Sequence, residues 1–280
     1  MRQGDLRDLL AAHGLRPNHR FGQNFLVDPA LLARIPEDAG VVAGEPVLEV
    51  GPGAGALTFE LLKVGAKVLA VELDHGLARL LRERFQEELD NGQLQLVEGD
   101  ILDTEERLHP EVEAWWDALP QPPRLVANLP YAISGPFLGR LPSRPLAGAT
   151  LLLQREVAEK AAGPQGKEEW SPMSIRLSLA FDAKLGRRLP PEVFWPRPKI
   201  DSAFLQLAPR EDALPAEHEA QLNEVLRFSF GQRRKTLLGR LRKQFPAWAA
   251  ALEAEDVASD TRPGAVGPSV WKAALARVVS

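Results

Sequence analysis

The sequence Asn128-Leu129-Pro130-Tyr131 combines a carboxamide, a proline and the only tyrosine of the chain. A carboxamide oxygen and a nearby backbone carbonyl can accept hydrogen bonds from the exocyclic amine of adenine, a poor nucleophile whose lone pair is delocalised into the ring. Pro130 has no N–H group, so the loop offers carbonyls there. Tyr131 can stack on a base drawn out of its helix or loop. The motif predicts methyl transfer to such an amine; a core tyrosine at a strand end is the simpler alternative.

A second aromatic candidate lies in the proline-rich segment from Val193 to Lys199, VFWPRPK. Its prolines restrict the backbone, so we expect Phe194 to hold the target base against Tyr131. Arg197 and Lys199 would contact RNA phosphates. The alternative is an ordinary hydrophobic hairpin tip.

A glycine-rich turn, Gly51-Pro52-Gly53-Ala54-Gly55, follows the apolar run PVLEV (46 to 50). Glycine allows a ligand to approach bare backbone. The spacing G-x-G-x-G differs from the G-x-G-x-x-G of dinucleotide-binding turns. The turn therefore predicts a nucleoside site without a pyrophosphate clamp.

Acidic residues follow the next two apolar runs, as Glu72 in VELD and Asp100 in EGDI. A carboxylate about 20 residues after such a turn can accept hydrogen bonds from ribose hydroxyls, and Asp100 can accept from an adenine amino group. A nucleoside site without phosphate contacts points to S-adenosylmethionine. Acidic residues that only cap helices are the alternative.

The elements that must position these residues follow an alternating pattern. Five apolar runs predict parallel strands between amphipathic helices, in a doubly wound α/β domain: 46–50, 66–72, 93–99, 124–129 and 149–154. Runs at 184–189 and 201–208 predict a closing antiparallel pair. Residues 1–14 and 28–39 predict short helices around a loop, and beyond the polar stretch 208–217 the apolar spacing is helical. We therefore expect a methyltransferase domain at 1–208, with N-terminal helices and a cofactor-closing loop at 1–45, and a helical RNA-binding domain at 209–280.

Composition excludes several kinds of chemistry. The chain of 280 residues has no cysteine, which excludes disulfides and thiolate catalysis. Its five histidines are scattered, so we expect no metal site. No apolar stretch is long enough for a membrane span and the N-terminus does not resemble a signal peptide, so we expect a cytoplasmic protein. Nothing in the sequence indicates an obligate dimer, so we expect a monomer.

Basic residues are concentrated in one part of a chain whose formal net charge is −4. Between Arg227 and Lys243 there is no carboxylate, and seven cations occur there: Arg227, Arg233, Arg234, Lys235, Arg240, Arg242 and Lys243. This segment predicts a phosphate-binding face with salt-sensitive affinity. A solvated helix face paired with acids elsewhere is the alternative.

These motifs together resemble the S-adenosylmethionine-dependent rRNA adenine dimethyltransferases, specifically the type that acts on small-subunit rRNA. The resemblance covers nearly the whole chain, in the order FGQNFLVD (21–28), LEVGPGAGALT (48–58), VELD (71–74), EGDIL (98–102), NLPY (128–131), QREVA (154–158), FWPRPKIDSA (194–203) and FGQRRKTL (230–237). It implies a Rossmann-like class I methyltransferase domain with a small all-helical C-terminal domain. It also implies dimethylation of two adjacent adenosines in the 3′-terminal hairpin of 16S rRNA, and a role in small-subunit biogenesis.

The resemblance assigns roles to individual residues. Gln23, Asn24 and Leu26 would close over the methionine end of the cofactor, and Asn128, Leu129, Pro130, Tyr131 and Phe194 would form the catalytic set. The full set expected at the cofactor is Gln23, Asn24, Leu26, Glu49, Gly51, Gly53, Glu72, Leu73, Asp100, Ile101 and Asn128. RNA contacts are expected from Arg197, Lys199, Arg227, Arg233, Arg234, Lys235 and Arg240.

Three other functions stay open at this point. A large-subunit rRNA adenine methyltransferase would share the chemistry. A non-catalytic RNA-binding assembly factor could retain the fold without the activity. A DNA adenine methyltransferase would share the Asn-Leu-Pro-Tyr motif.

Overall fold

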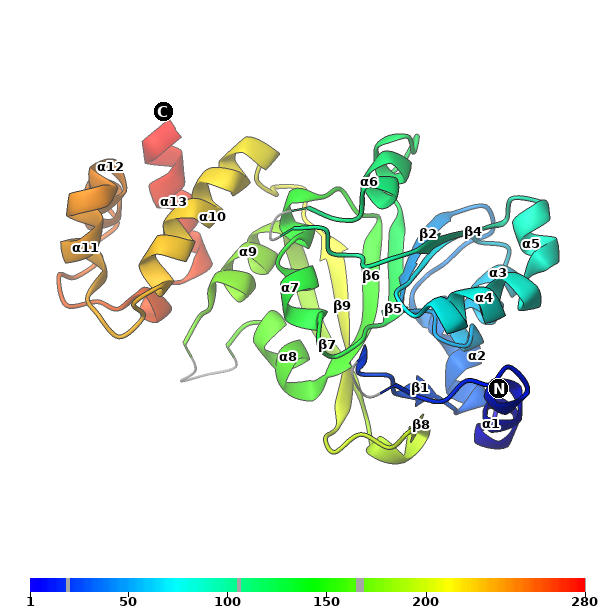
Figure 1. Ribbon diagram of the computed structural model, residues 1–280. Coiled ribbons are helices and arrows are strands. Elements are labelled where there is room, and N and C mark those ends of the chain that lie inside the picture. Colours follow the sequence, from blue (N-terminus) through cyan, green and yellow to red (C-terminus); the bar gives the residue numbers. More distant parts are fainter. Residues whose placement is uncertain (19–20, 105–106, 165–168, 280) are drawn as a thin grey trace. The chain divides into compact units, whose positions relative to one another are not determined.

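The computed structural model describes residues 1–18, 21–104, 107–164 and 169–279 (Figure 1). The chain divides into two compact units. Unit 1 comprises Met1–Phe137, Pro145–Ala158 and Lys184–Ala208. Unit 2 comprises Leu138–Arg144, Glu159–Ala183 and the chain from Pro209 onward. Unit 1 thus ends at Ala208, and two segments that precede this residue in the sequence also belong to unit 2.

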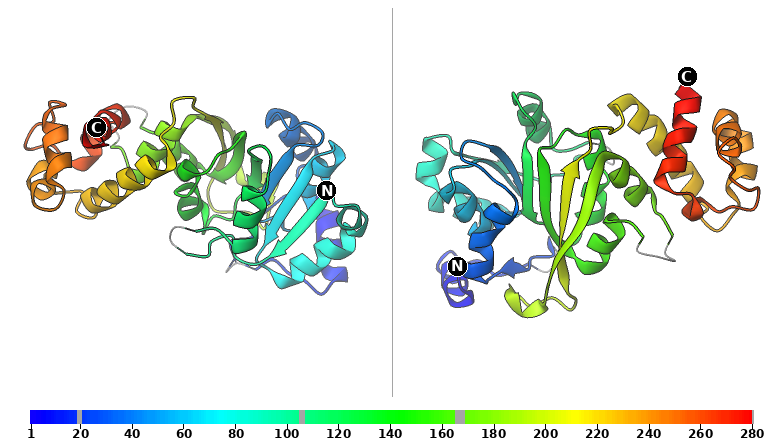
Figure 2. Two further views of the ribbon diagram at one scale, coloured as in Figure 1. Left: turned by 90° about the horizontal axis from the view of Figure 1, so that it is seen from above. Right: turned by 180° about the vertical axis from the view of Figure 1, so that it is seen from behind.

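A seven-stranded sheet forms the centre of the α/β fold, in the order β4-β3-β2-β5-β6-β9-β7. The strands are β2 (Pro46–Val50), β3 (Lys67–Glu72), β4 (Leu94–Glu98), β5 (Arg124–Asn128), β6 (Gly148–Gln154), β7 (Phe181–Leu189) and β9 (Ser202–Pro209). The first five strands in the sheet order pair in parallel, whereas β9 runs antiparallel to β6. The predicted doubly wound α/β fold and the closing position of the last two strands are confirmed (Figure 2).

Helices cover the sheet and bury the apolar side chains of its central strands. Val47 and Leu48 of β2 are fully buried, as expected of a parallel strand with both faces covered. The helices α2 (Pro29–Asp38), α3 (Ala56–Lys63) and α4 (His75–Arg84) share one apolar core with β2 and β3. Further helices before residue 162 are α5 (Gln86–Asp90), α6 (Pro110–Asp117), α7 (Ser134–Leu138) and α8 (Arg155–Ala161). Short 3-10 helices lie at Leu141–Ser143, Pro191–Val193 and Pro263–Ala265.

A small second sheet joins the N-terminal segment to the proline-rich segment. β1 (Phe25–Leu26) pairs antiparallel with β8 (Phe194–Trp195), so that Leu26 lies opposite Phe194 (Figure 1). The guanidinium of Arg7, on α1 (Gln3–Ala12), lies 5.1 Å from the ring centre of Trp195. Two-residue strands carry no periodic signal, so the sequence did not predict this ladder.

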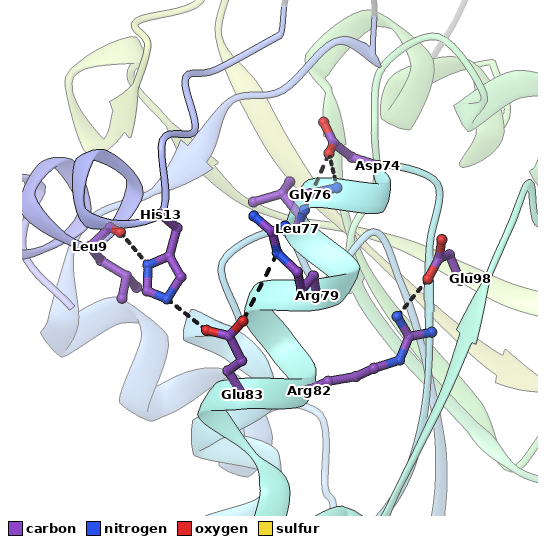
Figure 3. A network of polar contacts seen from close by, with 9 residues as sticks. All are labelled: Leu9, His13, Asp74, Gly76, Leu77, Arg79, Arg82, Glu83 and Glu98. Atoms are coloured by element: carbon purple, nitrogen blue, oxygen red, sulfur yellow. Dashed lines mark hydrogen bonds and ion pairs between the residues drawn. The ribbon is translucent and has the colours of Figure 1, made fainter.

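Polar contacts attach α1 to α4 in unit 1 (Figure 3). The imidazole of His13 lies between the Leu9 carbonyl, 2.8 Å from Nδ1, and the Glu83 carboxylate, 3.1 Å from Nε2. Arg82, the residue before Glu83 on α4, donates to Glu98 at the end of β4 over 2.6 Å. These contacts fix α4, whose first residue follows Asp74.

Unit 2 is built from α9 (Pro172–Ala180), α10 (Ala216–Phe230), α11 (Leu237–Gln244), α12 (Pro246–Glu253) and α13 (Pro268–Val279). Their buried side chains form one cluster that includes Ile175, Leu222 and Trp271. Arg176 and Glu219 form an ion pair that is buried in this unit. Taken over the described residues, no helix is both long and apolar enough to cross a membrane.

Candidate active site

A pocket lies in unit 1 at the carboxyl ends of β2, β3, β4 and β5, where ligands of open α/β sheets bind. Every residue that the sequence predicts for cofactor binding lines this pocket. Leu129, Pro130 and Tyr131 of the predicted catalytic set line it as well. The pocket therefore brings together side chains that lie more than 100 residues apart in the sequence.

The glycine turn between β2 and α3 presents bare backbone to the pocket. Gly51 and Gly53 have φ angles of +70° and +61°, which side chains rarely adopt. A Cβ atom at Gly51 would lie 2.9 Å from the ring of Pro130, and one at Gly53 would lie 2.8 Å from the ring of Phe25. Both positions thus require glycine for conformation and for space.

Glu72, at the end of β3, supports this turn. Its Oε2 accepts from the Gly53 backbone N–H and its Oε1 from the Asp74 N–H, each over 2.9 Å. The side chain is 6% exposed, and burial raises the pKa of Glu72 to about 7 against the opposing effect of these hydrogen bonds. Each oxygen keeps a second lone pair, so the carboxylate can also accept from a ligand hydroxyl.

Glu49, in the neighbouring strand β2, is the most deeply buried carboxyl of the pocket. It is 1% exposed, and its Oε2 has no hydrogen-bond partner. Burial raises the pKa of Glu49 to about 8; an interaction with the Thr58 side-chain hydroxyl opposes this effect and the nearby charge of Glu72 reinforces it. The neutral carboxyl is therefore the main form near neutral pH.

The end of β4 contributes the third acidic residue of the pocket. Asp100 is exposed and its Oδ1 accepts from the Leu102 N–H over 2.9 Å, and Ile101 beside it is buried. Leu73, after β3, is 40% exposed although it lines the pocket. Leu73 and Ile101 thus provide apolar surface next to a carboxylate that retains acceptor capacity.

The N-terminal loop is attached to the sheet edge through two side chains. Gln23 Nε2 donates to Asp74 Oδ2 over 3.0 Å. Asn128 Nδ2 donates to the Asn24 backbone carbonyl, also over 3.0 Å. The loop contributes Gln23, Asn24 and the buried Leu26 to the pocket; residues 19 and 20 of the expected cofactor-closing loop lie outside the described residues.

Tyr131 lies at the pocket with its hydroxyl attached to a different strand. Its Oη is 2.7 Å from the Oγ of Ser202, which is fully buried at the start of β9. Burial raises the pKa of the Tyr131 phenol, an effect that the Ser202 hydrogen bond partly offsets. The hydrogen bond to Ser202 thus fixes the hydroxyl end of the Tyr131 ring.

The charge of the pocket separates it from phosphate-binding sites. Three carboxyl side chains line it, those of Glu49, Glu72 and Asp100. No lysine, arginine or histidine side chain is among the lining residues that the structure describes. Phosphates are normally held by cationic groups, so this site suits a nucleoside whose charge is positive.

A profile of the ribosomal RNA adenine dimethylase family matches residues 14–264. The chain belongs to this family. Ribosomal RNA small subunit methyltransferase A of Magnetococcus marinus is 39% identical over 246 residues, which cover 87% of this chain and 85% of that protein. The protein of the same name from Opitutus terrae is 35% identical over 280 residues, with 97% and 96% covered.

Solved structures support the same grouping. The 23S rRNA methyltransferase ErmE has a TM-score of 0.66 and 28% identity, over 92% of this chain and 100% of that one. A dimethyladenosine transferase from Plasmodium falciparum has a TM-score of 0.67 over 89% and 95% of the two chains; at 24% identity it shows the shared fold. The protein is an rRNA adenine dimethyltransferase, and S-adenosylmethionine is its methyl donor.

The pocket of this dimethylase fits S-adenosylmethionine. Gly51 and Gly53 line the pocket with backbone that carries no side chain, and the buried Oε2 of Glu49 lacks a hydrogen-bond partner. The carboxyl groups of the pocket can accept hydrogen bonds from hydroxyl and amino groups and attract cationic groups, which matches a nucleoside with a sulfonium centre. In the described part of the chain no cluster of histidine, aspartate or glutamate side chains could hold a metal ion.

Phe194 is the predicted catalytic residue that the structure does not bring to the pocket. Its side chain is 3% exposed, packs in the core with Leu26 and Val126, and is absent from the pocket lining. Because this side chain is buried, the expected stacking of Phe194 on a base would require the ring to become exposed. The exposed Arg197 beyond it forms an ion pair with Glu192, and Lys199 is exposed.

The predicted RNA-binding cations of the dimethylase fall into two groups. Arg233, Arg234 and Lys235 are exposed in the turn between α10 and α11, and Arg227 is exposed on α10. Arg240 instead donates to the carbonyls of Phe228 and Ser229 and lies 4.5 Å above the Phe228 ring. The Arg240 guanidinium therefore satisfies two backbone carbonyls at the end of α10. The charge pattern of the sequence did not indicate this structural role.

Sequence reasoning missed two polar residues at the site. Asp74 accepts from Gln23 and, through Oδ1, from the Gly76 and Leu77 N–H groups at the start of α4. Its place directly before a helix is an N-cap signal that could have found it. Ser202 lies 71 residues after Tyr131, and nothing in the sequence links the two.

Proposed function

We propose that this chain dimethylates the exocyclic amines of two adjacent adenosines in the 3′-terminal hairpin of small-subunit rRNA, as a step of small-subunit assembly in the cytoplasm. The observation that carries the proposal is the position of Asn128 and Tyr131 on the edge of a carboxyl-lined pocket. The names of the relatives at 35% to 39% identity support the small subunit as the source of the substrate.

Residues of unit 1 would hold the cofactor. Glu72 would accept from the ribose hydroxyls and Asp100 from the adenine amino group, with Leu73 and Ile101 against the base. Gly51 and Gly53 would lie against the ligand, and Gln23, Asn24 and Leu26 would cover its methionine end. S-adenosylmethionine supplies an electrophilic methyl group on a sulfonium when it is bound.

The Asn-Leu-Pro-Tyr motif would orient the target amine. The Nδ2 of Asn128 is engaged by Asn24, which directs the Oδ1 to act as an acceptor. This oxygen and the Leu129 carbonyl would accept from the two amine hydrogens and favour a pyramidal nitrogen with an exposed lone pair. No strong base is needed at the amine, and the displaced proton can pass to water.

Tyr131 would stack on the extruded adenine. Its hydroxyl is held by Ser202, so little side-chain entropy remains to be lost when the base arrives. Base stacking on an aromatic ring is worth roughly 1–3 kcal/mol. Phe194, which is buried in this structure, would add to this contact only if its ring became exposed.

We also propose residues 209–280 as the RNA-binding domain. The exposed Arg233, Arg234 and Lys235 would contact phosphates, together with Arg227. RNA grooves display little sequence information to side chains, so we expect recognition of shape, backbone and extruded bases.

Large-subunit rRNA is the second candidate substrate. The 23S rRNA methyltransferase ErmE is 28% identical and covers 92% of this chain, which favours shared chemistry. The higher identity to the proteins named for the small subunit favours that substrate.

The deciding experiment measures transfer of labelled methyl groups to unmodified small subunits, unmodified large subunits and duplex DNA, followed by mass mapping of the RNA. Two dimethylated adenosines near the 3′ end of small-subunit rRNA are expected. Modification of large subunits or DNA alone would establish the corresponding alternative. No transfer and no cofactor binding would indicate a non-catalytic assembly factor.

A further inference from the structure

The side-chain amide of Gln23 has both of its polar atoms engaged by the protein. Its Oε1 accepts from the Asn18 backbone N–H over 2.7 Å, and its Nε2 donates to Asp74 Oδ2 over 3.0 Å. A carboxamide accepts through its oxygen and donates through its nitrogen, so these two contacts fix the direction in which the amide faces. Gln23 thus attaches the loop before β1 to the residue that precedes α4.

Asp74 is itself held at the start of α4 (Figure 3). Its Oδ1 accepts from the N–H groups of Gly76 and Leu77, over 2.9 and 3.2 Å, and its own N–H donates to Glu72 Oε1 over 2.9 Å. The other oxygen, Oδ2, accepts from Gln23. Asp74 is not among the pocket-lining residues that the structure describes, so an effect of Asp74 on the reaction must pass through its partners.

The same loop contacts the Asn-Leu-Pro-Tyr motif. Next to Gln23, the backbone carbonyl of Asn24 accepts from Asn128 Nδ2 over 3.0 Å, and the Asn24 side chain donates to the Gly22 carbonyl over 3.0 Å. Gly22 has a φ angle of +63°, and a Cβ atom there would lie 3.6 Å from the Tyr131 backbone nitrogen. These three loop residues therefore connect the start of α4 to the motif that would hold the target base.

We propose that Asp74 is a positioning residue for methyl transfer, which acts on Asn128 through this loop. By holding Gln23, it keeps the Asn24 carbonyl where that carbonyl accepts from Asn128, so that the Asn128 oxygen is directed at the target amine. A misplacement of about 1 Å at a reacting centre can slow a reaction roughly 100-fold. The inference rests on the proposed function, because it takes Asn128 as the residue that orients the amine.

An exchange of the two side chains tests the bond and leaves the cap of α4 in place. In Gln23→Glu, a carboxylate oxygen replaces the amide nitrogen and faces Asp74 Oδ2, so the bond is lost. In Asp74→Asn, Oδ1 can still cap α4, but the new amide nitrogen faces the nitrogen of Gln23. In the double variant Gln23→Glu/Asp74→Asn, the introduced amide can donate to the introduced carboxylate, which restores the bond with its direction reversed.

The measurement is the single-turnover rate of methyl transfer to unmodified small subunits at saturating S-adenosylmethionine and RNA. Each single substitution should lower this saturated rate by roughly 10- to 100-fold. The double variant should return the rate to within about threefold of the wild type, because the lost interaction is restored. If the single Gln23→Glu protein does not fold, Gln23→Ala removes the same bond and should show the same loss of rate.

Two outcomes of this comparison would overturn the inference. Calorimetry gives the dissociation constant of the cofactor separately, and a residue that only helped to hold the cofactor would raise this constant and leave the saturated rate unchanged. A double variant that is as slow as the product of the two single losses would show that the bond itself does not set the rate.

Two controls separate positioning from general stability. Asp28 caps α2 by accepting from the Leu31 N–H over 3.0 Å, so Asp28→Asn makes the same chemical change at another helix start and should retain the wild-type rate. In an Asn128→Ala background, Asp74→Asn should cause little further loss, because its effect is exerted through Asn128. A further loss as large as that in the wild type would contradict the inference.

The proposed function has separate readouts in the same experiment. Absence of methyl transfer by the wild-type protein, or transfer by Asn128→Ala at the wild-type rate, would refute the proposed function or its assignment of Asn128. An active wild type and an impaired Asn128→Ala, together with fully active Asp74→Asn and Gln23→Glu, would refute the inference alone.

Discussion

The side-chain amide of Asn128 donates to the backbone carbonyl of Asn24 over 3.0 Å, across 104 residues of sequence. This hydrogen bond joins the N-terminal loop to the end of β5 and leaves the side-chain oxygen of Asn128 as its acceptor. The residue proposed to orient the target amine thus also contacts the loop expected at the cofactor.

Asn128→Ala should reduce methyl transfer by about 100-fold or more while cofactor affinity changes only a fewfold, because its acceptor role is exercised at the reacting amine. Single-turnover rates and calorimetric dissociation constants measure the two effects separately. Transfer at the wild-type rate would contradict the assignment of Asn128.

Glu72→Gln should weaken cofactor binding by roughly 10- to 100-fold, the range expected for hydrogen bonds to a charged group. The amide keeps one acceptor but its NH₂ faces a backbone N–H that donated to the carboxylate. Titration calorimetry gives the dissociation constant, and an unchanged value would refute the ribose role. The pocket-lining Leu73→Met serves as a conservative control for altered packing.

Stability of the cofactor-free protein should fall as pH rises from about 5 to 8. Glu49 and Glu72 have pKa values raised by burial to about 8 and about 7, from 4.5. The folded state therefore binds more protons than the unfolded state in this window, and each such proton contributes a slope of at most about 1.4 kcal/mol per pH unit. Denaturant titrations of wild type and Glu49→Gln check this: a slope that is the same in both would exclude Glu49 as a source.

Ser202→Ala should raise the pKa of the Tyr131 phenol further, since the Ser202 hydrogen bond lowers it in the native protein. Tyr131 is the only tyrosine, so ultraviolet absorbance during alkaline titration reports this residue alone, and Tyr131→Phe provides the blank. If the ring position matters for stacking, the same substitution will also raise KM for RNA. An unchanged titration curve would show that the Tyr131 to Ser202 contact is not formed in solution.

Replacing Arg233, Arg234 and Lys235 with alanine should weaken RNA binding and reduce its salt dependence. Three lost phosphate contacts would lower the slope of log K against log salt by roughly 2. Arg242→Ala is the control, because this arginine of α11 is paired with Glu253 over 2.6 Å. An unaltered slope in the triple variant would assign RNA binding to another surface.

The sequence predicts the sheet and the pocket well because both depend on local patterns. Apolar runs ending in Glu72, Asp100 and Asn128 specify strand ends, and the carboxyl ends of parallel strands share one edge. Phe194 shows the limit: a residue in a proline-rich segment can face solvent or core, and its pairing with Leu26 is a contact between distant segments. The uses of Ser202 and Arg240 likewise depend on tertiary contacts that no local pattern encodes.

Unit 2 is built from segments that lie on both sides of Lys184–Ala208 in the sequence. Unit 2 includes Ile175 and Leu179, which lie on α9 and precede β7 and β9 in the sequence. These two side chains pack with Leu222 and Trp271. A terminal cassette beginning at Pro209 would leave them without partners. Exchange of the segment from Pro209 onward between relatives would therefore also require matching side chains at Ile175 and Leu179.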